Sequence, residues 1–373
     1  MNIGFDAKRA FNNKTGLGYY SRWVMNSLSE YYPENNYYAY TPRINPEVMV
    51  NGEQNITVRM PRSWFHRTFH QFWRTLALPS YLKNDNIEVY HGLSNELPSS
   101  IGMSSKIRKI VTIHDLIFLR YPAYYNFMDR KIYLKKVKHA CDTADVIIAI
   151  SEYTANDLVN ILGIPRSKIQ VVYQNCPDVY KQVFSENAIQ QVKQKYFIKN
   201  PYLLCVSTIE PRKNQELLVK AFDQIEDKDL SLVIVGKDES YYALQLKEYL
   251  HKRKLEERVK IVSYVQVDDL PKLYQGATGF VFPSKIEGLG LPVLEALHSK
   301  VPVLTTAGTS MQEIAQNAAL YYEKDNLHDL QKQLHTLVYD STVRSTLIHN
   351  AAQQVALFDS QKLCQQMINI YTN

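Results

Sequence analysis

Short runs of β-branched and aromatic residues alternate with stretches of helical periodicity along the whole chain. In the first half these runs predict strands at Ile3–Phe5, Tyr37–Thr41, Ile56–Arg59, Glu88–His91, Lys109–Ile113, Val146–Ile150 and Ile169–Val172. In the second half they predict strands at Leu203–Val206, Leu232–Val235, Val259–Val262, Gly279–Phe282 and Val301–Leu304. Strands that alternate with helices are typical of parallel sheets with helices on both faces. The pattern therefore predicts an α/β fold.

A polar stretch between Gln174 and Pro201 separates the two sets of strands. Such a stretch is typical of a domain boundary, so we expect one doubly wound domain over residues 1–176 and a second over residues 177–357. Residues 358–373 have an apolar helical face and could pack back on the first domain. Because open parallel sheets bind ligands at the carboxyl ends of their strands, we expect the domains to face a central cleft.

The composition is that of a globular protein, with 45% hydrophobic and 21% charged residues in a chain of 373. These values exclude collagen-like, low-complexity and wholly disordered chains. No apolar run approaches the roughly 18 residues of a membrane-spanning helix, and Asp6 and Lys8 interrupt any signal sequence. The four cysteines form no Cys-x-x-Cys pair, which argues against a zinc site. We therefore expect a cytoplasmic protein that holds no metal.

The net charge of +6 lies entirely in the first half of the chain. Residues 1–180 contain 21 Lys and Arg against 15 Asp and Glu, whereas residues 181–373 contain 22 of each kind. An excess of cations is typical of a surface that meets anions, such as a membrane or a phosphate-bearing substrate. An uneven scatter of solvated charges is an equal alternative.

The strongest chemical signal is the segment from Phe282 to Glu295, where a buried strand is followed by a glycine-containing loop and a helix. Glycines allow close backbone approach, and the positive end of a helix favours a phosphate. Glu287 precedes the phosphate position and Glu295 follows it, so one carboxylate can bind sugar hydroxyls and the other ribose hydroxyls. This arrangement suits a nucleotide sugar. The alternative makes Glu287 a loop residue and Glu295 a partner of the helix dipole.

A second signal follows the strand Leu203–Val206, where Arg212 and Lys213 are predicted to open a helix. Cations at a helix start oppose the helix dipole, at a cost of about a few tenths of a kcal/mol unless an anion binds there. A diphosphate leaving group would supply that anion, and the two cations could stabilise it without a metal ion. The alternative is a pair of surface charges.

Two segments of the first half carry weaker signals. Gly16 and Gly18 lack the third glycine of a dinucleotide fingerprint, so they fit a phosphate-facing loop or a simple turn. His114 ends a predicted strand beside Asp115, although a histidine by itself is more often structural. No nucleophile-elbow pattern accompanies it, so acyl transfer finds no support.

The segment 63–76 places aromatic residues on one helical face and Arg67, His70 and Arg74 on another. Residues 130–138 add a basic helix. Both patterns suit a membrane interface, while burial of the aromatic face in the core is the favoured alternative.

These motifs together resemble the retaining glycosyltransferases of family 4, which have the two-domain GT-B fold. The resemblance covers nearly the whole chain and rests on Gly16–Gly18, His114–Asp115, Ala144–Asp145 with Ile150–Glu152, Glu210–Asn214, and the two glutamates Glu287 and Glu295. It implies a catalytic set of His114, Arg212, Lys213 and Glu287. It implies a donor-binding set of Gly16, Gly18, Arg212, Lys213, Ser263, Tyr264, Glu287, Gly288, Leu289, Gly290, Leu291 and Glu295. Within these sets, the resemblance assigns the transferred sugar to His114 and Glu287, the diphosphate to Arg212 and Lys213, and the ribose to Glu295.

Within this family the sequence resembles mannosyltransferases of bacterial surface-polysaccharide synthesis. This resemblance implies transfer of a hexosyl group, with mannose from GDP-mannose favoured, to a glycan or lipid-linked acceptor, with retention and without a cofactor or metal. The alternatives are a UDP-sugar-dependent transferase of glucose, galactose or N-acetylglucosamine, a GT-B sugar-nucleotide epimerase, and a non-catalytic nucleotide-sugar-binding subunit. The first domain would serve the acceptor and the second the donor. We expect the protein to contact the anionic inner face of the plasma membrane and not to bind nucleic acid.

Overall fold

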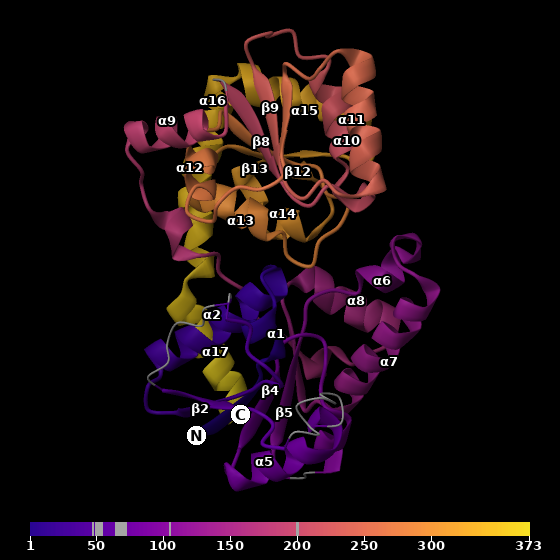
Figure 1. Cartoon of the computed structure of the whole chain (residues 1–373), viewed down its shortest axis with the longest axis vertical. Helices are drawn as coiled ribbons and strands as arrows, with labels where there is room; N and C mark the ends of the chain where they lie inside the picture. The colour runs from indigo at the N-terminus through magenta and orange to yellow at the C-terminus, as the bar shows by residue number, and fades with distance from the viewer. Residues whose placement is uncertain (47, 49–54, 64–72, 104–105, 199–200) are drawn as a thin grey trace. The chain divides into compact units, whose positions relative to one another are not determined.

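The computed structural model describes residues 1–46, 48, 55–63, 73–103, 106–198 and 201–373. Contacts divide the chain into two compact units, one of Met1–Asn175 with Phe358–Asn373 and the other of Cys176–Leu357. Each unit contains one parallel sheet with helices around it (Figure 1). These sheets confirm the predicted α/β class.

The first unit contains, among its described residues, a seven-stranded sheet in the order β3-β2-β1-β4-β5-β6-β7. Its strands are β1 (Asn2–Asp6), β2 (Asn36–Tyr40), β3 (Ile56–Arg59), β4 (Val89–Gly92), β5 (Arg108–Ile113), β6 (Val146–Ala149) and β7 (Ile169–Val171). All neighbouring strands are parallel. The order reverses between β1 and β4, which is the switch point at which such sheets bind ligands.

Helices of the first unit pack around this sheet. They are α1 (Lys8–Asn12), α2 (Gly16–Tyr31), α5 (Leu78–Asn84), α6 (Ile117–Arg120), α7 (Phe127–Thr143), α8 (Glu152–Leu162) and α17 (Ser360–Thr372). Although α17 ends the chain, it packs beside α2 in the first unit (Figure 1). Its buried residues Leu363 and Met367 lie on the apolar face that the sequence predicts.

The second unit contains, within its described part, a six-stranded parallel sheet in the order β10-β9-β8-β11-β12-β13. Its strands are β8 (Tyr202–Val206), β9 (Ser231–Val235), β10 (Val259–Val262), β11 (Gly279–Phe282), β12 (Val303–Thr306) and β13 (Ala319–Tyr322). Its helices are α9 (Glu186–Lys195), α10 (Gln215–Phe222), α11 (Tyr241–Arg253), α12 (Leu270–Gln275), α13 (Leu291–His298), α14 (Ser310–Ala315), α15 (Leu327–Tyr339) and α16 (Ser341–Gln354). The central strands β8 and β11 are almost wholly buried, so their ends place loops with little freedom.

Two strands of the second unit differ from the prediction. The strand predicted at Val301–Leu304 begins at Val303, because the N–H of Val301 donates to the carbonyl of Ala296 in α13. Strand β13 was not predicted, since its Ala and Leu residues favour helices as much as strands.

Among the described residues, no helix is long and apolar enough to cross a lipid bilayer.

Candidate functional site

The carboxylate of Glu287 is the meeting point of two cations in the second unit. Its Oε1 lies 2.5 Å from Nζ of Lys213 and 3.0 Å from Nη1 of Arg212. The hydroxyl of Ser284 also donates to Oε1. The three charged side chains are largely buried. The structure therefore brings together three of the four residues in the predicted catalytic set.

Two strand ends supply these side chains. Glu287 follows β11, and the 3₁₀ turn Pro211–Lys213 follows β8, the neighbouring strand. The N–H of Lys285 donates to the carbonyl of Arg212 at 2.9 Å, which fastens one loop to the other. Adjacent parallel strands thus hold the cations and the carboxylate in a fixed arrangement.

The prediction that the cations open a helix is wrong in detail. Arg212 and Lys213 lie in the 3₁₀ turn, and α10 begins only at Gln215. Asn214 separates the two with a φ of 59°, a left-handed conformation that asparagine tolerates better than most residues. The cations therefore precede the N-cap residue Asn214 and do not lie in the first turn of α10.

The charged side chains of this cluster are held in fixed positions. Burial alone would raise the pKa of Glu287, but the charges of Lys213 and Arg212 bring it below its ordinary value. Glu287 is therefore ionised at neutral pH. The more exposed Glu210 lies 2.7 Å from Arg212 as a second carboxylate, so the two cations meet two carboxylates. Arg212 also donates to the carbonyl of Ile286 and to Glu210, so its guanidinium is held at several points. Preorganised cations of this kind suit a diphosphate.

The glycine at position 290 shapes the loop between Glu287 and α13. Gly290 has a φ of 102°, and a Cβ at this position would lie 2.6 Å from Cγ of Met311. Any other residue would meet both strain and a clash. Leu289 is buried, Leu291 starts α13, and Gly288 lies in the loop before them. The predicted donor loop thus has a backbone path that its sequence enforces.

Glu295 is buried inside the second unit and is bonded to tyrosines. The hydroxyl of Tyr274 donates to Oε2 of Glu295 at 2.9 Å, and Tyr180 donates a second hydrogen bond. Burial raises the pKa of Glu295 to about 8, although both hydrogen bonds oppose the shift. Glu287 and Glu295 therefore have opposite protonation states at neutral pH. The motif alone, which contains two identical residues, does not predict this difference.

Ser263 and Tyr264 follow β10, at the edge of the second sheet. Both are exposed, and Ser263 is hydrogen-bonded to Asp238. They share no hydrogen bond or ion pair with the described residues of the Glu287 cluster. Their donor-binding role stays a prediction.

The imidazole of His114 lies at the end of β5 in the first unit and is almost fully buried. Its Nε2 lies 2.9 Å from the carbonyl of Leu93 and donates to it, while its ring packs edge-on against Tyr20. Burial lowers the pKa of His114 to about 4, although the bond to Leu93 opposes the shift. His114 is therefore a neutral imidazole with a fixed tautomer.

Gly16 and Gly18 form the first turn of α2 and not a loop before it. A Cβ at position 18 would lie 1.9 Å from the carbonyl oxygen of Asn13, so only glycine fits there. A Cβ at position 16 would meet no atom within 4 Å. The close approach of the Asn13 carbonyl therefore requires glycine at position 18 but not at position 16.

The aromatic and basic segment 63–76 includes residues 64–72, which lie outside the described residues. Trp73 is buried and packs edge-on against Tyr81. Arg74 forms ion pairs with Asp6 and Glu96. Core packing therefore accounts for Trp73, and Arg74 is held by two carboxylates of the first unit. The membrane role of the segment stays a prediction.

Three site residues went unnoticed in the sequence. Ser284 lies two residues after β11 and within the Glu287 motif, so its place in the chain could have identified it. Tyr180 and Tyr274 come from distant segments, and no sequence spacing connects them with Glu295.

Family comparisons agree with this division of the chain. The family model described as "Glycosyl transferases group 1" matches residues 188–354, and that described as "Glycosyltransferase Family 4" matches residues 24–174. Together the two matches span most of the chain.

Individual proteins extend this similarity. The chain is 26% identical to the O-antigen chain mannosyltransferase B of Escherichia coli, over 76% of this chain and 74% of that protein. It is 24% identical to the O-antigen chain mannosyltransferase RfbU of Salmonella typhimurium, over 75% and 72% of the two chains. The crystal structure of Anabaena HepE in complex with UDP and glucose matches 99% of both chains with a TM-score of 0.78 and 17% identity. With its two matched domains and two parallel sheets, the chain belongs to the group 1 and family 4 glycosyltransferases and has the GT-B fold.

Proposed function

We propose that the protein transfers a mannosyl group from GDP-mannose to a glycan or lipid-linked acceptor, with retention at the anomeric carbon and without a divalent metal. The observation that carries the proposal is the pair of cations, Lys213 and Arg212, fixed on the carboxylate of Glu287. The similarity to two O-antigen mannosyltransferases supports mannose as the sugar.

The cation pair supplies what a diphosphate leaving group needs. As the bond between the anomeric carbon and the phosphate oxygen breaks, negative charge develops on the diphosphate. Lys213 and Arg212 stabilise that charge, because their positions are fixed before the reaction begins. This role makes a divalent ion unnecessary.

The carboxylate of Glu287 has a second task when the donor is bound. It is ionised, so it accepts hydrogen bonds from hydroxyls of the transferred sugar and fixes the sugar beside the two cations. The acceptor hydroxyl attacks the face from which the diphosphate leaves, and a leaving phosphate oxygen takes its proton. The resemblance to the family assigns His114 to the transferred sugar, and in that role the imidazole would be neutral.

A UDP-hexose is the second candidate donor. A HepE structure of similar fold contains UDP and glucose, so UDP-hexoses are tested beside GDP-mannose. In this proposal Arg212 and Lys213 meet the diphosphate and not the base, so they would not select between guanine and uracil.

The decisive experiment incubates the protein with GDP-mannose, UDP-glucose, UDP-galactose or UDP-N-acetylglucosamine, with a glycan acceptor and with or without EDTA. We expect GDP release and an α-linked mannosyl product from GDP-mannose, with unchanged turnover in EDTA. A UDP-linked substrate would assign the second donor class, an altered nucleotide sugar would indicate an epimerase, and binding without turnover would indicate a silent subunit. Loss of turnover in EDTA that magnesium restores would contradict metal independence.

A further inference from the structure

A chain of buried hydrogen bonds crosses the first unit. The hydroxyl of Tyr371 lies 2.7 Å from Nδ1 of His91, and Nε2 of His91 lies 2.8 Å from Oγ1 of Thr112. The same Oγ1 lies 2.9 Å from the hydroxyl of Tyr20. All four side chains are at most 2% exposed. The chain thus connects α17, β4, β5 and α2 without access to water.

Each member of the chain needs its neighbours. Burial lowers the pKa of His91 to about 3, so the imidazole is neutral, donating at one ring nitrogen and accepting at the other. Burial also raises the pKa of Tyr20 and of Tyr371, so both phenols keep their protons. Loss of one hydroxyl would leave a buried partner unsatisfied, which is more costly than the loss of an exposed hydrogen bond.

One end of this hydrogen-bond chain, Tyr20, contacts His114. The ring of Tyr20 packs on the ring of His114 at a centroid distance of 4.7 Å and an angle of 87°. Thr112 and His114 are two residues apart at the end of β5, so their side chains point to the same side of the sheet. The imidazole of His114 is held by Tyr20 through its ring and by the carbonyl of Leu93 through Nε2.

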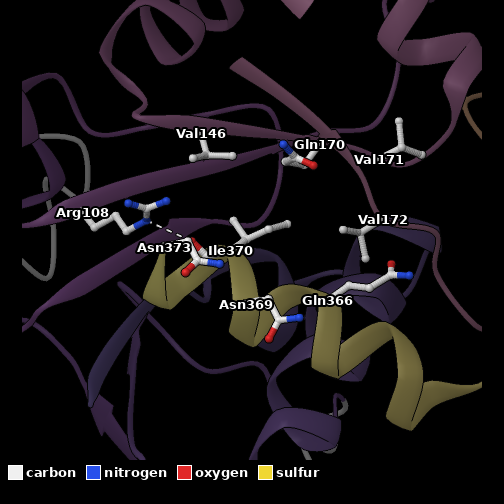
Figure 2. A pocket seen from close by; sticks show the side chains of 9 residues that line it. All are labelled: Arg108, Val146, Gln170, Val171, Val172, Gln366, Asn369, Ile370 and Asn373. Atoms are coloured by element: carbon white, nitrogen blue, oxygen red, sulfur yellow. Dashed lines mark hydrogen bonds between the residues drawn. The ribbon is translucent and has the colours of Figure 1, made fainter. Parts of the chain in front are cut away.

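The other end of the chain is fixed by the last turns of α17. Nε of Arg108 donates to the carbonyl of Ile370 at 2.9 Å, one residue before Tyr371 (Figure 2). Arg108 and Ile370 line a recess of about 490 Å³. At the start of the helix, Nε1 of Trp23 donates to the hydroxyl of Ser360 at 3.1 Å. Tyr371 therefore has a fixed position relative to β4.

We propose that Tyr371, His91 and Thr112 are positioning residues, which hold Tyr20 and through it the ring of His114. The proposal rests on the proposed function, in which His114 meets the transferred sugar. A helix at the far end of the sequence would thus set the orientation of an imidazole at the end of β5.

The test uses full-length protein with ¹⁵N-labelled histidine, in which the ring signals of His114 are assigned from their absence in His114→Gln. In Tyr371→Phe we expect the ring ¹⁵N shifts of His114 to move, kcat to fall about tenfold and the donor KM to stay unchanged, because orientation and not binding is lost. His91→Gln, which retains a donor and an acceptor, should keep more activity than His91→Leu.

Tyr40→Phe is the matched control, because it removes a buried phenol that bonds to Asp85 in the same unit but outside the chain. It should leave the His114 signals and kcat unchanged. Unchanged His114 shifts and kcat in Tyr371→Phe would overturn the proposal, as would equal effects of Tyr371→Phe and Tyr40→Phe. Absence of transfer by the wild-type protein would overturn the proposed function instead, and the His114 spectra would still decide the positioning role.

Discussion

The phenol of Tyr274 donates a hydrogen bond of 2.9 Å to Oε2 of Glu295 in the buried interior of the second unit. Burial leaves the charged form of this carboxyl poorly solvated and outweighs the hydrogen bond, which by itself would lower the pKa. The pKa of Glu295 accordingly rises from 4.5 to about 8.

This shift predicts a pH dependence of stability. Between pH 4.5 and 8 the unfolded chain loses the Glu295 proton while the folded protein retains it, so stability decreases as the pH rises through this window. The decrease is at most about 1.4 kcal/mol per pH unit. We expect Glu295→Gln, which cannot ionise, to lack this contribution, so its Tm relative to wild type should increase from pH 5 to pH 8.

The comparison with Glu295→Gln also removes the effect of other groups. Burial lowers the pKa of His91 and His114, which makes stability rise with pH in both proteins. That effect cancels in the difference. Parallel Tm curves for the two proteins would show that Glu295 is ionised in the folded state at pH 5.

Replacement of Lys213 by alanine should reduce turnover about a hundredfold, the typical effect of removing one preorganised charge donor. The variant should also lower Tm, because Glu287 keeps only Arg212 as a cationic partner. Lys220→Ala is the control, since Lys220 pairs with Glu216 on the surface of α10. Equal kcat in Lys213→Ala and Lys220→Ala would mean that Lys213 takes no part in the reaction.

Much of the cluster around Glu287 was predictable from the sequence, because the ends of buried strands can be recognised in the sequence. The runs that form β8 and β11 are apolar and bounded by polar residues, so the sequence places Arg212, Lys213 and Glu287 after two strands. It does not establish that these strands are neighbours or that the three side chains touch. Those facts depend on the pairing of β8 with β11, which is a tertiary contact.

Burial of charged side chains was harder to predict. Arg74 belongs to a pattern with an aromatic face and a basic face, yet Asp6 and Glu96, which are distant in sequence, pair with it. The phenols around Glu295 likewise come from other elements. Periodicity reports one element at a time, so it does not show which polar side chains find partners elsewhere in the fold.

The two glutamates should respond differently to amide substitution. Glu287→Gln should depress turnover strongly, because an amide is a weaker acceptor for sugar hydroxyls, while nucleoside diphosphate binding stays intact or tightens because Lys213 and Arg212 lose their anionic partner. Glu295→Gln should weaken binding of the free nucleotide. Isothermal titration with GDP and UDP measures both, with Glu248→Gln as an exposed control on α11. Equal nucleotide affinities in the Glu287 and Glu295 variants would contradict the assigned roles.

The excess positive charge of the first half should support reversible binding to an anionic membrane through α7. Phe127, Met128 and Ile132 are 59%, 64% and 47% exposed, so this helix presents apolar side chains to solvent. Lys131 and Lys135 are exposed on the same helix, and Nζ of Lys131 lies 4.4 Å from the ring centroid of Phe127. Helices that combine apolar and cationic side chains in this way bind at lipid interfaces.

The exposed face of α7 would bind a membrane through electrostatic attraction and through apolar insertion, and these two contributions depend differently on salt. Each Lys near an anionic membrane contributes about 1 kcal/mol, which salt screens, whereas apolar insertion is insensitive to salt. Co-sedimentation with anionic and neutral vesicles across a salt series separates the two. Lys131→Gln with Lys135→Gln should abolish the preference for anionic vesicles, and Phe127→Ser with Ile132→Ser should abolish the binding that survives high salt. The control variant Lys252→Gln with Lys362→Gln removes the same amount of charge elsewhere and should bind like wild type. Equal loss of binding in the two double variants would assign the positive charge to another role. The same conclusion would follow if the wild type showed no preference for anionic vesicles at low salt.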